Sequence, residues 1–371
     1  MIIIKKTNKI INRFSMHKKK YFSSQSLKDL NTFAIDVTAK KIIFVKTIQS
    51  LIDISKICQL SNIPYIILGE GSNVLFLENY VGVVIINRIK GIKIVEKKNF
   101  WLLHVFSGEK WHNLVKLTLN LGILGLENLA LIPGYIGSAA IQNIGAYGLE
   151  FKDVCQYVDI LSLKDNTIKR IYKNSCKFSY RNSIFKDQYK NEHAVIRVGI
   201  KLSKKWRPIV FSSLENYITP VNITAYKIFN IICKIRKKKL PDPKKIGNAG
   251  SFFKNPLIKK KKAQKLINLY KVPNYPQKNG LVKISAAWLI ENYKFKHLQI
   301  GDAAIHKKQK LILINKKNAT AQEIIKLAKI IHKCILKKFN ILLEPEVDLI
   351  GASGKIKASK IFKLNSKLKV I

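Results

Sequence analysis

The feature that most limits how this chain can fold is a strand–helix–strand pattern that runs into a glycine-rich loop. Apolar runs at residues 42–45, 65–68 and 83–86 predict three strands, and Thr47 stands where an N-cap would start an amphipathic helix between the first two. The second strand leads directly into the loop of residues 69–73, Gly-Glu-Gly-Ser-Asn. The loop lacks GxGxxG spacing and no helical pattern follows it, which argues against a Rossmann site. Its backbone N–H groups could still face a pyrophosphate; a plain tight turn is the alternative.

A second unusual segment, Gly125–Gly148, is rich in glycine, alanine and serine and nearly free of charge. It has too many glycines for a helix and too few charges for an ordinary surface loop. Small residues allow the backbone to approach a large flat ligand closely, so this segment is a candidate ligand wall. A glycine-rich packing corner is the alternative.

The rest of the chain divides near residue 205 into two regions. In the first region we predict a helix at residues 111–121 and strands at 157–163 and 194–202. In the second we predict helices at 223–237, 263–269, 286–292 and 321–339 and strands at 311–314 and 347–350. The segment between residues 239 and 256 is irregular.

Three short segments carry side chains that suit a reaction, although each is a weak signal alone. Tyr180 and Arg181 are adjacent, and an arginine offers a planar fork for a carboxylate or phosphate. Ser251 lies between glycine and two phenylalanines; without a G-x-S-x-G elbow it is a poor candidate for a hydrolase nucleophile, but it could donate a proton. Glu346 leads into a predicted strand, where a buried carboxylate would need a partner. An exposed arginine, a simple turn and a solvated carboxylate are the alternatives.

Composition limits the classes of function that remain. The 371 residues include 68 Lys plus Arg and 22 Asp plus Glu, which gives a formal net charge of +46. These basic residues are spread along the chain and lysine far outnumbers arginine, so we attribute the charge to an AT-rich codon bias rather than to nucleic-acid binding. The apolar fraction of 47% argues against disorder. No run approaches the ~20 apolar residues of a membrane span, so we expect no membrane contact.

Five scattered cysteines without a CxxC pair, and seven histidines without an HExxH motif, predict no metal site and a reducing cytoplasm. At the ends of the chain we expect a basic N-terminal extension over residues 1–24, with Met16 as the true start, and a frayed basic tail over residues 353–371.

Four motifs, taken in order, resemble one family. They are residues 68–75 (LGEGSNVL), 132–148 (IPGYIGSAAIQNIGAYG), 247–256 (GNAGSFFKNP) and 343–347 (LEPEV). With them, the chain resembles the UDP-N-acetylenolpyruvoylglucosamine reductases, flavoproteins that make UDP-N-acetylmuramate for peptidoglycan. The resemblance implies an α+β fold. A two-lobed FAD-binding domain of the vanillyl-alcohol-oxidase type would span residues 25–205, and a smaller α+β substrate-binding domain would span residues 206–352, with its last strand returning to the FAD domain.

The resemblance also implies roles for individual residues. Ser251 matches the proton donor of the family, and Arg181 and Glu346 match residues that stabilise developing charge. The positions that match substrate-binding residues are Tyr180, Lys239, Asn255 and Gln309. The positions that match the non-covalent FAD site are Gly69, Glu70, Gly71, Ser72, Asn73, Pro133, Gly134, Gly137, Ser138, Asn143, Gly145 and Ala146.

In the implied reaction, hydride passes from NADPH to FAD and then to C3 of the enolpyruvyl group of a UDP-sugar. Negative charge builds at C2 and needs electrostatic stabilisation. A serine hydroxyl is a weak acid, but this carbanion-like carbon is basic enough to take its proton. An ionised Glu346 would repel the substrate carboxylate, so we expect this residue to be protonated or oriented by a partner.

Two positions depart from the family pattern. Ser212 stands where better-known members carry a mobile lid tyrosine, with Tyr217 nearby as a possible substitute, and Asp348 stands where a basic residue is common. We expect a monomer whose partners are the UDP-sugar and NADPH, without nucleic acid. Another FAD-dependent oxidoreductase on the same scaffold and a polyanion-binding protein are the alternatives.

Overall fold

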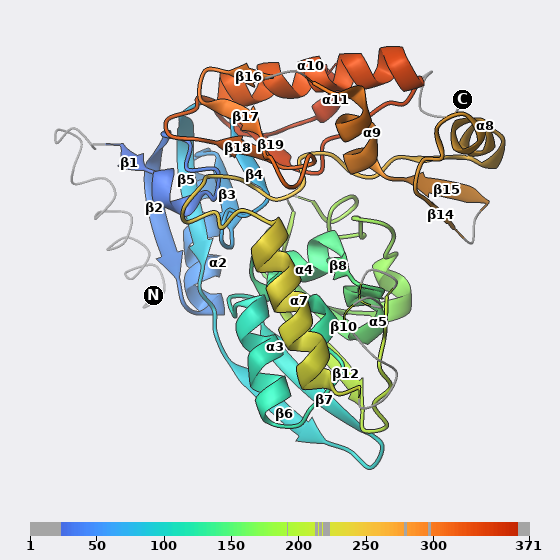
Figure 1. The fold of residues 1–371 in the computed structure, drawn as a ribbon. Helices are drawn as coiled ribbons and strands as arrows, with labels where there is room; N and C mark the ends of the chain where they lie inside the picture. The colour runs from blue at the N-terminus through green and yellow to red at the C-terminus, as the bar shows by residue number, and fades with distance from the viewer. Residues whose placement is uncertain are drawn as a thin grey trace, which may run out of the picture.

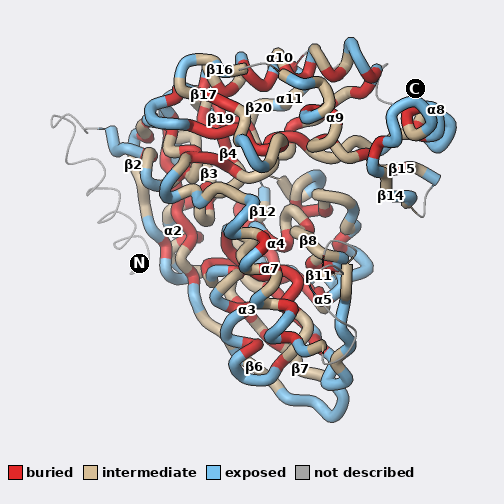
Figure 2. Tube along the Cα trace, viewed as in Figure 1, coloured by how far each residue is buried: buried red, intermediate tan, exposed pale blue. Residues whose placement is uncertain are grey.

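The computed structural model describes residues 24–362, except residues 191, 212–213, 215–216, 218–222, 278–279 and 296–297. Helices and strands are mixed along the chain (Figure 1), and the buried apolar side chains form two large clusters and two smaller ones. Buried segments run through each part of the molecule (Figure 2). The predicted start at Met16, the extension up to residue 23 and the position of Ser212 lie outside the described residues.

The first lobe is built on a four-stranded sheet with the order β1-β2-β5-β3. Its elements are β1 (Gln25–Ser26), β2 (Thr38–Val45), α2 (Ile48–Leu60), β3 (Tyr65–Leu68) and β5 (Tyr80–Asn87). Strands β2 and β3 both pair parallel with β5, which lies between them. Thr47 caps α2: its Oγ1 accepts a hydrogen bond from the backbone N–H of Ser50 at 3.0 Å. The predicted strand–helix–strand unit is confirmed.

The second lobe is a five-stranded antiparallel sheet with the order β11-β10-β12-β7-β6. Its strands are β6 (Ile92–Glu96), β7 (Phe100–Phe106), β10 (Cys155–Ser162), β11 (Ile168–Tyr172) and β12 (His193–Ser203). Helices α3 (Trp111–Asn120), α4 (Ile136–Gln142) and α7 (Ala225–Lys239) share one apolar cluster with the sheet. Figure 1 shows α3 and α7 in the same part of the molecule as this sheet. The shorter elements are η2 (Glu127–Leu129), β8 (Gly145–Ala146), β9 (Leu149–Glu150), α5 (Phe151–Val154) and η3 (Lys173–Cys176).

The expectation that Gly125–Gly148 contains no helix is wrong for α4, which lies inside it. Gly137 explains the exception. Its N–H donates to the carbonyl of Ser107 at 3.0 Å, and a Cβ at this position would lie 2.9 Å from the Cβ of Ser107. The glycine therefore lets the helix lie directly against the end of β7, and the contact outweighs its low helix propensity.

The C-terminal region carries α8 (Lys260–Tyr270), α9 (Ala286–Tyr293) and α10 (Ala321–Phe339), the last with the predicted bounds. Two small antiparallel sheets accompany them: β13 (Leu257–Lys259), β15 (Leu281–Ile284) and β14 (Asn274–Pro276) form one, and β16 (Gln299–Ile300), β17 (Ala303–Ile305) and β18 (Leu313–Asn315) form the other. Thr320 and Glu323 form a capping box that fixes the start of α10.

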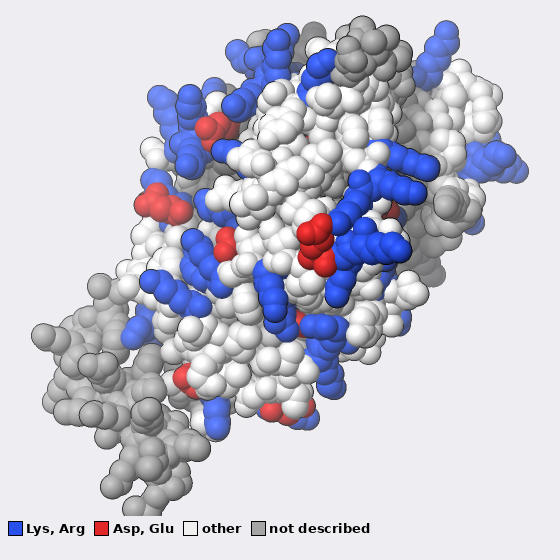
Figure 3. Space-filling view, turned by 90° about the horizontal axis from the view of Figure 1, so that it is seen from below, with Lys and Arg blue, Asp and Glu red and all other residues white. Residues whose placement is uncertain are grey.

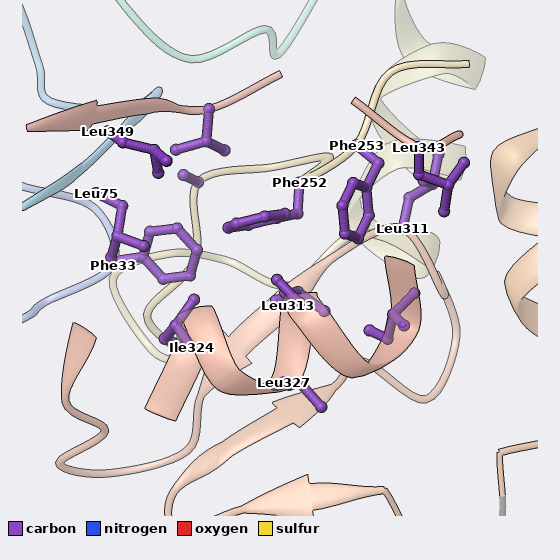
Figure 4. Close-up of a cluster of buried hydrophobic side chains, with 14 of the residues drawn as sticks. Phe33, Leu75, Phe252, Phe253, Leu311, Leu313, Ile324, Leu327, Leu343 and Leu349 are labelled. Carbon is purple, nitrogen blue, oxygen red and sulfur yellow. The ribbon is translucent and has the colours of Figure 1, made fainter. Parts of the chain in front are cut away.

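The first lobe and the C-terminal region share one apolar core. Phe33 and Leu75 come from the first lobe, and Phe252, Leu313 and Ile324 pack with them in the same cluster (Figure 4). Strand β19 (Asp348–Gly351) pairs parallel with β4 (Val74–Phe76), directly after the glycine-rich loop. This pairing places the last predicted strand next to β4, directly after the glycine-rich loop of the first lobe.

The predicted domain boundary at residue 205 and the predicted start of the tail at residue 353 both differ from the packing in the structure. Helix α7 follows the predicted boundary at residue 205, yet its buried side chains Ile228, Ile232 and Ile235 belong to the core of the second lobe. This packing favours a boundary after α7, and we propose residue 240. The prediction of a frayed tail from residue 353 is wrong up to residue 362, because β20 (Gly354–Ile356) pairs with β19 and α11 (Ala358–Phe362) buries Phe362 in the shared core.

Candidate active site

The predicted phosphate loop borders a cavity of about 680 Å³. All five residues of the loop Gly69–Asn73 line it, together with Tyr135, Gly137, Ser138 and Gln142 from the start, the body and the end of α4. This volume lies within the ~300–1,000 Å³ usual for ligand sites. The two glycine-rich segments that the sequence singled out therefore meet at one cavity, although they are more than 60 residues apart.

Glu70 and Asn73 tie the phosphate loop to its surroundings. Glu70 Oε2 accepts a hydrogen bond from the N–H of Gly134 at 2.6 Å, and Glu70 Oε1 lies 3.4 Å from Lys110 Nζ. Asn73 Nδ2 donates to Gln142 Oε1 at 2.8 Å and to the carbonyl of Glu346 at 3.2 Å. The loop is thus attached to the residues just before α4, to the last residue of α4 and to the segment that leads into β19.

Glycine is required at position 71 for a different reason from the one expected. Its φ is +66°, and a Cβ there would lie 2.1 Å from the carbonyl oxygen of Leu30. The N-terminal segment crosses the loop at this point, where the N–H of Thr32 donates to the Gly71 carbonyl at 3.1 Å. Packing of the chain on itself, rather than close approach of a ligand, requires glycine here.

The predicted catalytic pair is in direct contact. Arg181 Nε donates to Glu346 Oε1 at 3.0 Å, and Gln142 Nε2 donates to the same oxygen at 2.6 Å. The side chain of Arg181 is 21% exposed and that of Glu346 is 12% exposed, so the pair is largely removed from solvent. Glu346 is oriented by two partners, which is one of the two states expected for it. The interaction is charge-assisted and therefore strong for its length.

The backbone of Arg181 is in the left-handed region, with φ +55°. It sits in a tight turn in which Ser179 and Asn182 exchange backbone hydrogen bonds of 3.0 and 3.2 Å. Its Nη2 also donates to the carbonyl of Gly145 at 3.1 Å. A strained backbone that is held from several sides is typical of a functional position.

Backbone pairing brings the segment that follows Ser251 next to the segment of Glu346. The N–H of Glu346 donates to the carbonyl of Phe252 at 2.8 Å, and the N–H of Lys254 donates to the carbonyl of Glu344 at 2.9 Å. The segment that begins with the half-buried Ser251 therefore runs antiparallel to the Glu-Pro-Glu motif. Two motifs almost one hundred residues apart in sequence therefore lie side by side, one carrying Ser251 and the other Glu346.

Tyr180 and Asn255 line a second cavity, of about 380 Å³, next to the first site. The hydroxyl oxygen of Tyr180 accepts a hydrogen bond from the N–H of Asn255 at 3.3 Å, and Asn255 Oδ1 accepts one from the N–H of Ala286 at 2.9 Å. Burial raises the pKa of Tyr180. Lys283 Nζ lies 4.9 Å from the centre of the Tyr180 ring, and burial lowers the pKa of this lysine.

Lys239 and Gln309 line neither of these two cavities. Lys239 is the exposed last residue of α7, and Gln309 lies in the turn between β17 and β18. Their neighbours are linked: Lys308 Nζ donates to the carbonyl of Lys238 at 3.3 Å. The structure thus brings these two predicted residues to one edge of the C-terminal region. Tyr217, the possible substitute for the lid tyrosine, is 55% exposed.

Five of the predicted FAD-binding residues, Pro133, Gly134, Asn143, Gly145 and Ala146, are absent from the lining of the 680 Å³ cavity. Asn143 is fully buried; its Nδ2 donates to Glu150 Oε2 and to the carbonyl of Ser179, both at 3.0 Å. Gly134 thus contacts the phosphate loop, and Asn143 and Gly145 contact the turn that carries Arg181.

Several residues of the site were missed by the sequence reasoning. Gln142 lies inside a quoted motif but was given no role, and Lys186, Lys190, His193 and Lys355 line the cavity as well. The lysines carried no signal in a chain with this many basic residues. On the face seen in Figure 3, lysines and arginines are spread over many positions with acidic residues among them.

The groups that line the 680 Å³ cavity fit a flavin dinucleotide. The buried Nδ1 of His193 has no hydrogen-bond partner among the described residues, so the lining retains an unused polar atom. Backbone of the glycine-rich loop, amide groups and lysines face the same space, and these groups suit an anionic dinucleotide. Within the described part of the chain, no group of three potential metal ligands comes together, and no helix is long and apolar enough to cross a bilayer.

Comparison with known proteins agrees with this geometry. Residues 39–172 match an FAD-binding domain, and residues 242–350 match the C-terminal domain of UDP-N-acetylenolpyruvoylglucosamine reductase. The reductase of Buchnera aphidicola subsp. Acyrthosiphon pisum (strain APS) is 99% identical over 356 residues, which is 96% of this chain and 100% of that relative. The reductase of Escherichia coli (strain K12) is 48% identical over 336 residues, which is 90% of this chain and 98% of that relative.

A crystal structure of the reductase from Thermus caldophilus aligns with a TM-score of 0.61 over 88% of this chain and 98% of that chain, at 24% sequence identity, and supports the fold. The predicted α+β fold, with an FAD-binding domain before a C-terminal domain of the reductase type, is confirmed. The match in both domains and in nearly full length shows that the chain belongs to the family of UDP-N-acetylenolpyruvoylglucosamine reductases, which are FAD-dependent oxidoreductases.

Proposed function

We propose that the chain catalyses the NADPH-dependent reduction of UDP-N-acetyl-3-O-(1-carboxyvinyl)glucosamine to UDP-N-acetylmuramate, a step in the synthesis of peptidoglycan precursors. One observation carries the proposal. Arg181, Gln142 and Glu346 form a hydrogen-bonded group next to the cavity proposed for FAD, which Gln142 lines, and the segment that follows Ser251 pairs with the segment of Glu346.

FAD, when bound, supplies the capacity to take hydride from NADPH and to transfer it to the enol ether carbon of the substrate. The chain contributes the environment for the charge that follows. Arg181 is suited to the substrate carboxylate and to the charge at the neighbouring carbon, because a guanidinium can bind a carboxylate through two parallel N–H groups. Its Nε and one Nη are already used by Glu346 and Gly145, which fixes the direction of the remaining N–H groups.

Glu346 acts by positioning Arg181. Two donors hold its carboxylate, so its charge is balanced locally and repels the substrate less than a free carboxylate would. Ser251 donates the proton to the substrate carbon that becomes carbanion-like. Ser251 is half-buried, which limits competition from water.

The UDP-sugar would lie along the C-terminal region. Tyr180 and Asn255 are suited to the sugar portion, and Lys239 and Gln309 share an edge where the diphosphate or uridine could bind. The phosphate loop, Gly137 and Ser138 would contact FAD directly, and Pro133, Gly134, Asn143, Gly145 and Ala146 would support those contacts. We also propose a monomer that works in the cytoplasm, consistent with five free cysteines. Light scattering tests the monomer: a mass well above 42.4 kDa would contradict it.

The proposal is tested with purified protein. We expect a yellow protein whose flavin is bleached by NADPH without oxygen and regains its colour on addition of the enolpyruvyl sugar nucleotide. A protein without bound flavin, even after incubation with FAD, would contradict any FAD-dependent function. Flavin that NADPH reduces and the sugar nucleotide never reoxidises would favour another oxidoreductase on the same scaffold.

The role of Ser251 has its own test. Ser251→Ala should leave flavin reduction by NADPH intact and slow reoxidation by the sugar nucleotide about 10²- to 10⁴-fold, the range of general-acid catalysis. Ser203→Ala, at the exposed end of β12, is the matched control and should alter neither half-reaction. Equal loss of both half-reactions in Ser251→Ala would exclude the proton-donor role.

A further inference from the structure

Asp348 stands next to the phosphate loop because of the way β19 pairs. Its N–H donates to the carbonyl of Asn73 at 3.0 Å, and β19 then runs parallel to β4 with Asp348 opposite Val74. Asp348 is one of the residues that line the 680 Å³ cavity. A lone carboxylate there would repel an anionic dinucleotide.

Two lysines converge on this carboxylate from other parts of the chain. Lys186 Nζ, from the segment before β12, lies 3.9 Å from Asp348 Oδ1, and Lys355 Nζ, from β20, contacts the same oxygen. The side chains of Lys186 and Lys355 are only 15% and 20% exposed. Both line the cavity, so the two ammonium groups and the phosphate loop face one space.

The charges in the part of the cavity around Asp348 do not cancel. Lys186, Lys190 and Lys355 line the cavity with Asp348, and three ammonium groups with one carboxylate leave a net charge of +2. Glu70 is the other acid of the lining, and it is paired with Lys110. Burial lowers the pKa of Lys355, and Lys186 and Lys190 lower it further while Asp348 opposes the change. An uncompensated positive charge in a partly buried space stabilises an anion of matching size.

We propose that Lys186 and Lys355, held in place by Asp348, bind the pyrophosphate of FAD opposite the backbone of the phosphate loop. The inference rests on the FAD site of the proposed function and adds to it the side chains that neutralise the dinucleotide. Asp348 is a positioning residue in this arrangement: it keeps two mutually repelling ammonium groups within reach of one ligand. A basic residue at position 348 is therefore unnecessary in this chain.

The test compares FAD with riboflavin, which has the same ring system but lacks the pyrophosphate and the adenosine. The full-length protein, freed of flavin, is titrated with FAD and with riboflavin, and binding is followed by flavin fluorescence. In Lys355→Gln and Lys186→Gln we expect FAD to bind about tenfold more weakly or worse, the effect of losing a charge-assisted hydrogen bond, and riboflavin to bind as in the unmodified protein. The dependence of FAD binding on salt should also become shallower. Lys357→Gln, an exposed lysine on the same segment outside the cavity, is the matched control and should change nothing.

Exchanging the charges of Asp348 and Lys355 distinguishes an effect of charge on FAD binding from an effect of side-chain shape. Lys355→Asp alone should weaken FAD binding more than Lys355→Gln, and the double variant Asp348→Lys with Lys355→Asp should recover most of the lost affinity, because it keeps the same charges in the same part of the cavity. Equal weakening of FAD and riboflavin, or unchanged FAD affinity in both single Gln variants, would overturn the proposal. Failure of the unmodified protein to bind FAD at all would instead refute the proposed function.

Discussion

Gly71 offers the sharpest test of why the phosphate loop contains glycine, because Gly122 provides a natural comparison. Both have a left-handed backbone, with φ of +66° and +70°. A Cβ at Gly71 would lie 2.1 Å from the Leu30 carbonyl oxygen and 2.9 Å from the Cα of Asn31, whereas a Cβ at Gly122 would meet nothing within 4 Å. The two substitutions to alanine thus share the cost of the backbone and differ in the clash.

The expected magnitudes follow from this difference. A left-handed alanine costs about 1–2 kcal/mol at either position. At Gly71 the overlap with backbone adds about 1–3 kcal/mol, because the segment of Leu30 and Asn31 or the loop itself must move. Gly71→Ala should therefore destabilise the protein by about 2–5 kcal/mol and Gly122→Ala by about 1–2 kcal/mol.

The assay is urea unfolding of both variants without FAD, followed by FAD titration of the folded proteins. Gly71→Ala should unfold at lower urea than Gly122→Ala even without the cofactor, and it should bind FAD more weakly because the loop is displaced. If flavin-free Gly71→Ala were as stable as Gly122→Ala while FAD binding alone was lost, the glycine would serve the ligand and the packing argument would be refuted.

Three further predictions concern side chains. Gln142→Leu removes a charge-assisted hydrogen bond to Glu346, worth about 1.5–3 kcal/mol. Reoxidation of the flavin by the sugar nucleotide should therefore slow about 10- to 100-fold, while reduction by NADPH should not change; equal effects on both half-reactions would contradict a role of Gln142 in orienting Glu346. Asp159→Ala leaves the guanidinium groups of Arg170 and Arg197 without their shared carboxylate, and urea unfolding should show a loss of stability of about 2–3 kcal/mol. This is less than the ~3–5 kcal/mol of a fully buried pair, because the two arginine side chains are 39% and 34% exposed. An unchanged urea midpoint would mean that solvent replaces the ion pairs. Burial lowers the pKa of His332, so its contribution to stability should be fully present above the ordinary histidine pKa of about 6.5 and should be lost at lower pH, by at most about 1.4 kcal/mol per pH unit. His332→Gln should reduce this slope of stability against pH between about pH 7.5 and 5.5, and an identical slope would exclude the histidine as its cause.

Local patterns were sufficient to predict the elements that local forces define. The bounds of α10 follow from its capping box and its helical spacing, and α2 follows from the cap at Thr47. The meeting of the two glycine-rich segments was predicted only through the order of the motifs, since no local rule joins Glu70 to Gly134.

The parts that could not be predicted depend on contacts between distant residues. Helix α7 has an amphipathic pattern that would suit either domain, and only packing assigns it to the second lobe. Lys186 and Lys355 look like any other lysine in the sequence, and their meaning appears only when β19 brings Asp348 between them. A basic composition thus hid the basic residues that line the site.

The pairing of β19 with β4 has a consequence for how the protein is made in the cell. Asn73 and Glu346, which join the phosphate loop to the last strand, are 273 residues apart. During synthesis the first lobe leaves the ribosome long before the strand that completes its loop, and the apolar core that Phe33 shares with Phe252 is also incomplete until then. The cavity beside the phosphate loop can therefore form completely only after residue 348 has been made. Loading of the cofactor becomes a step after translation, and a nascent chain that stalls before residue 348 would expose an unpaired β4 edge to chaperones or to aggregation.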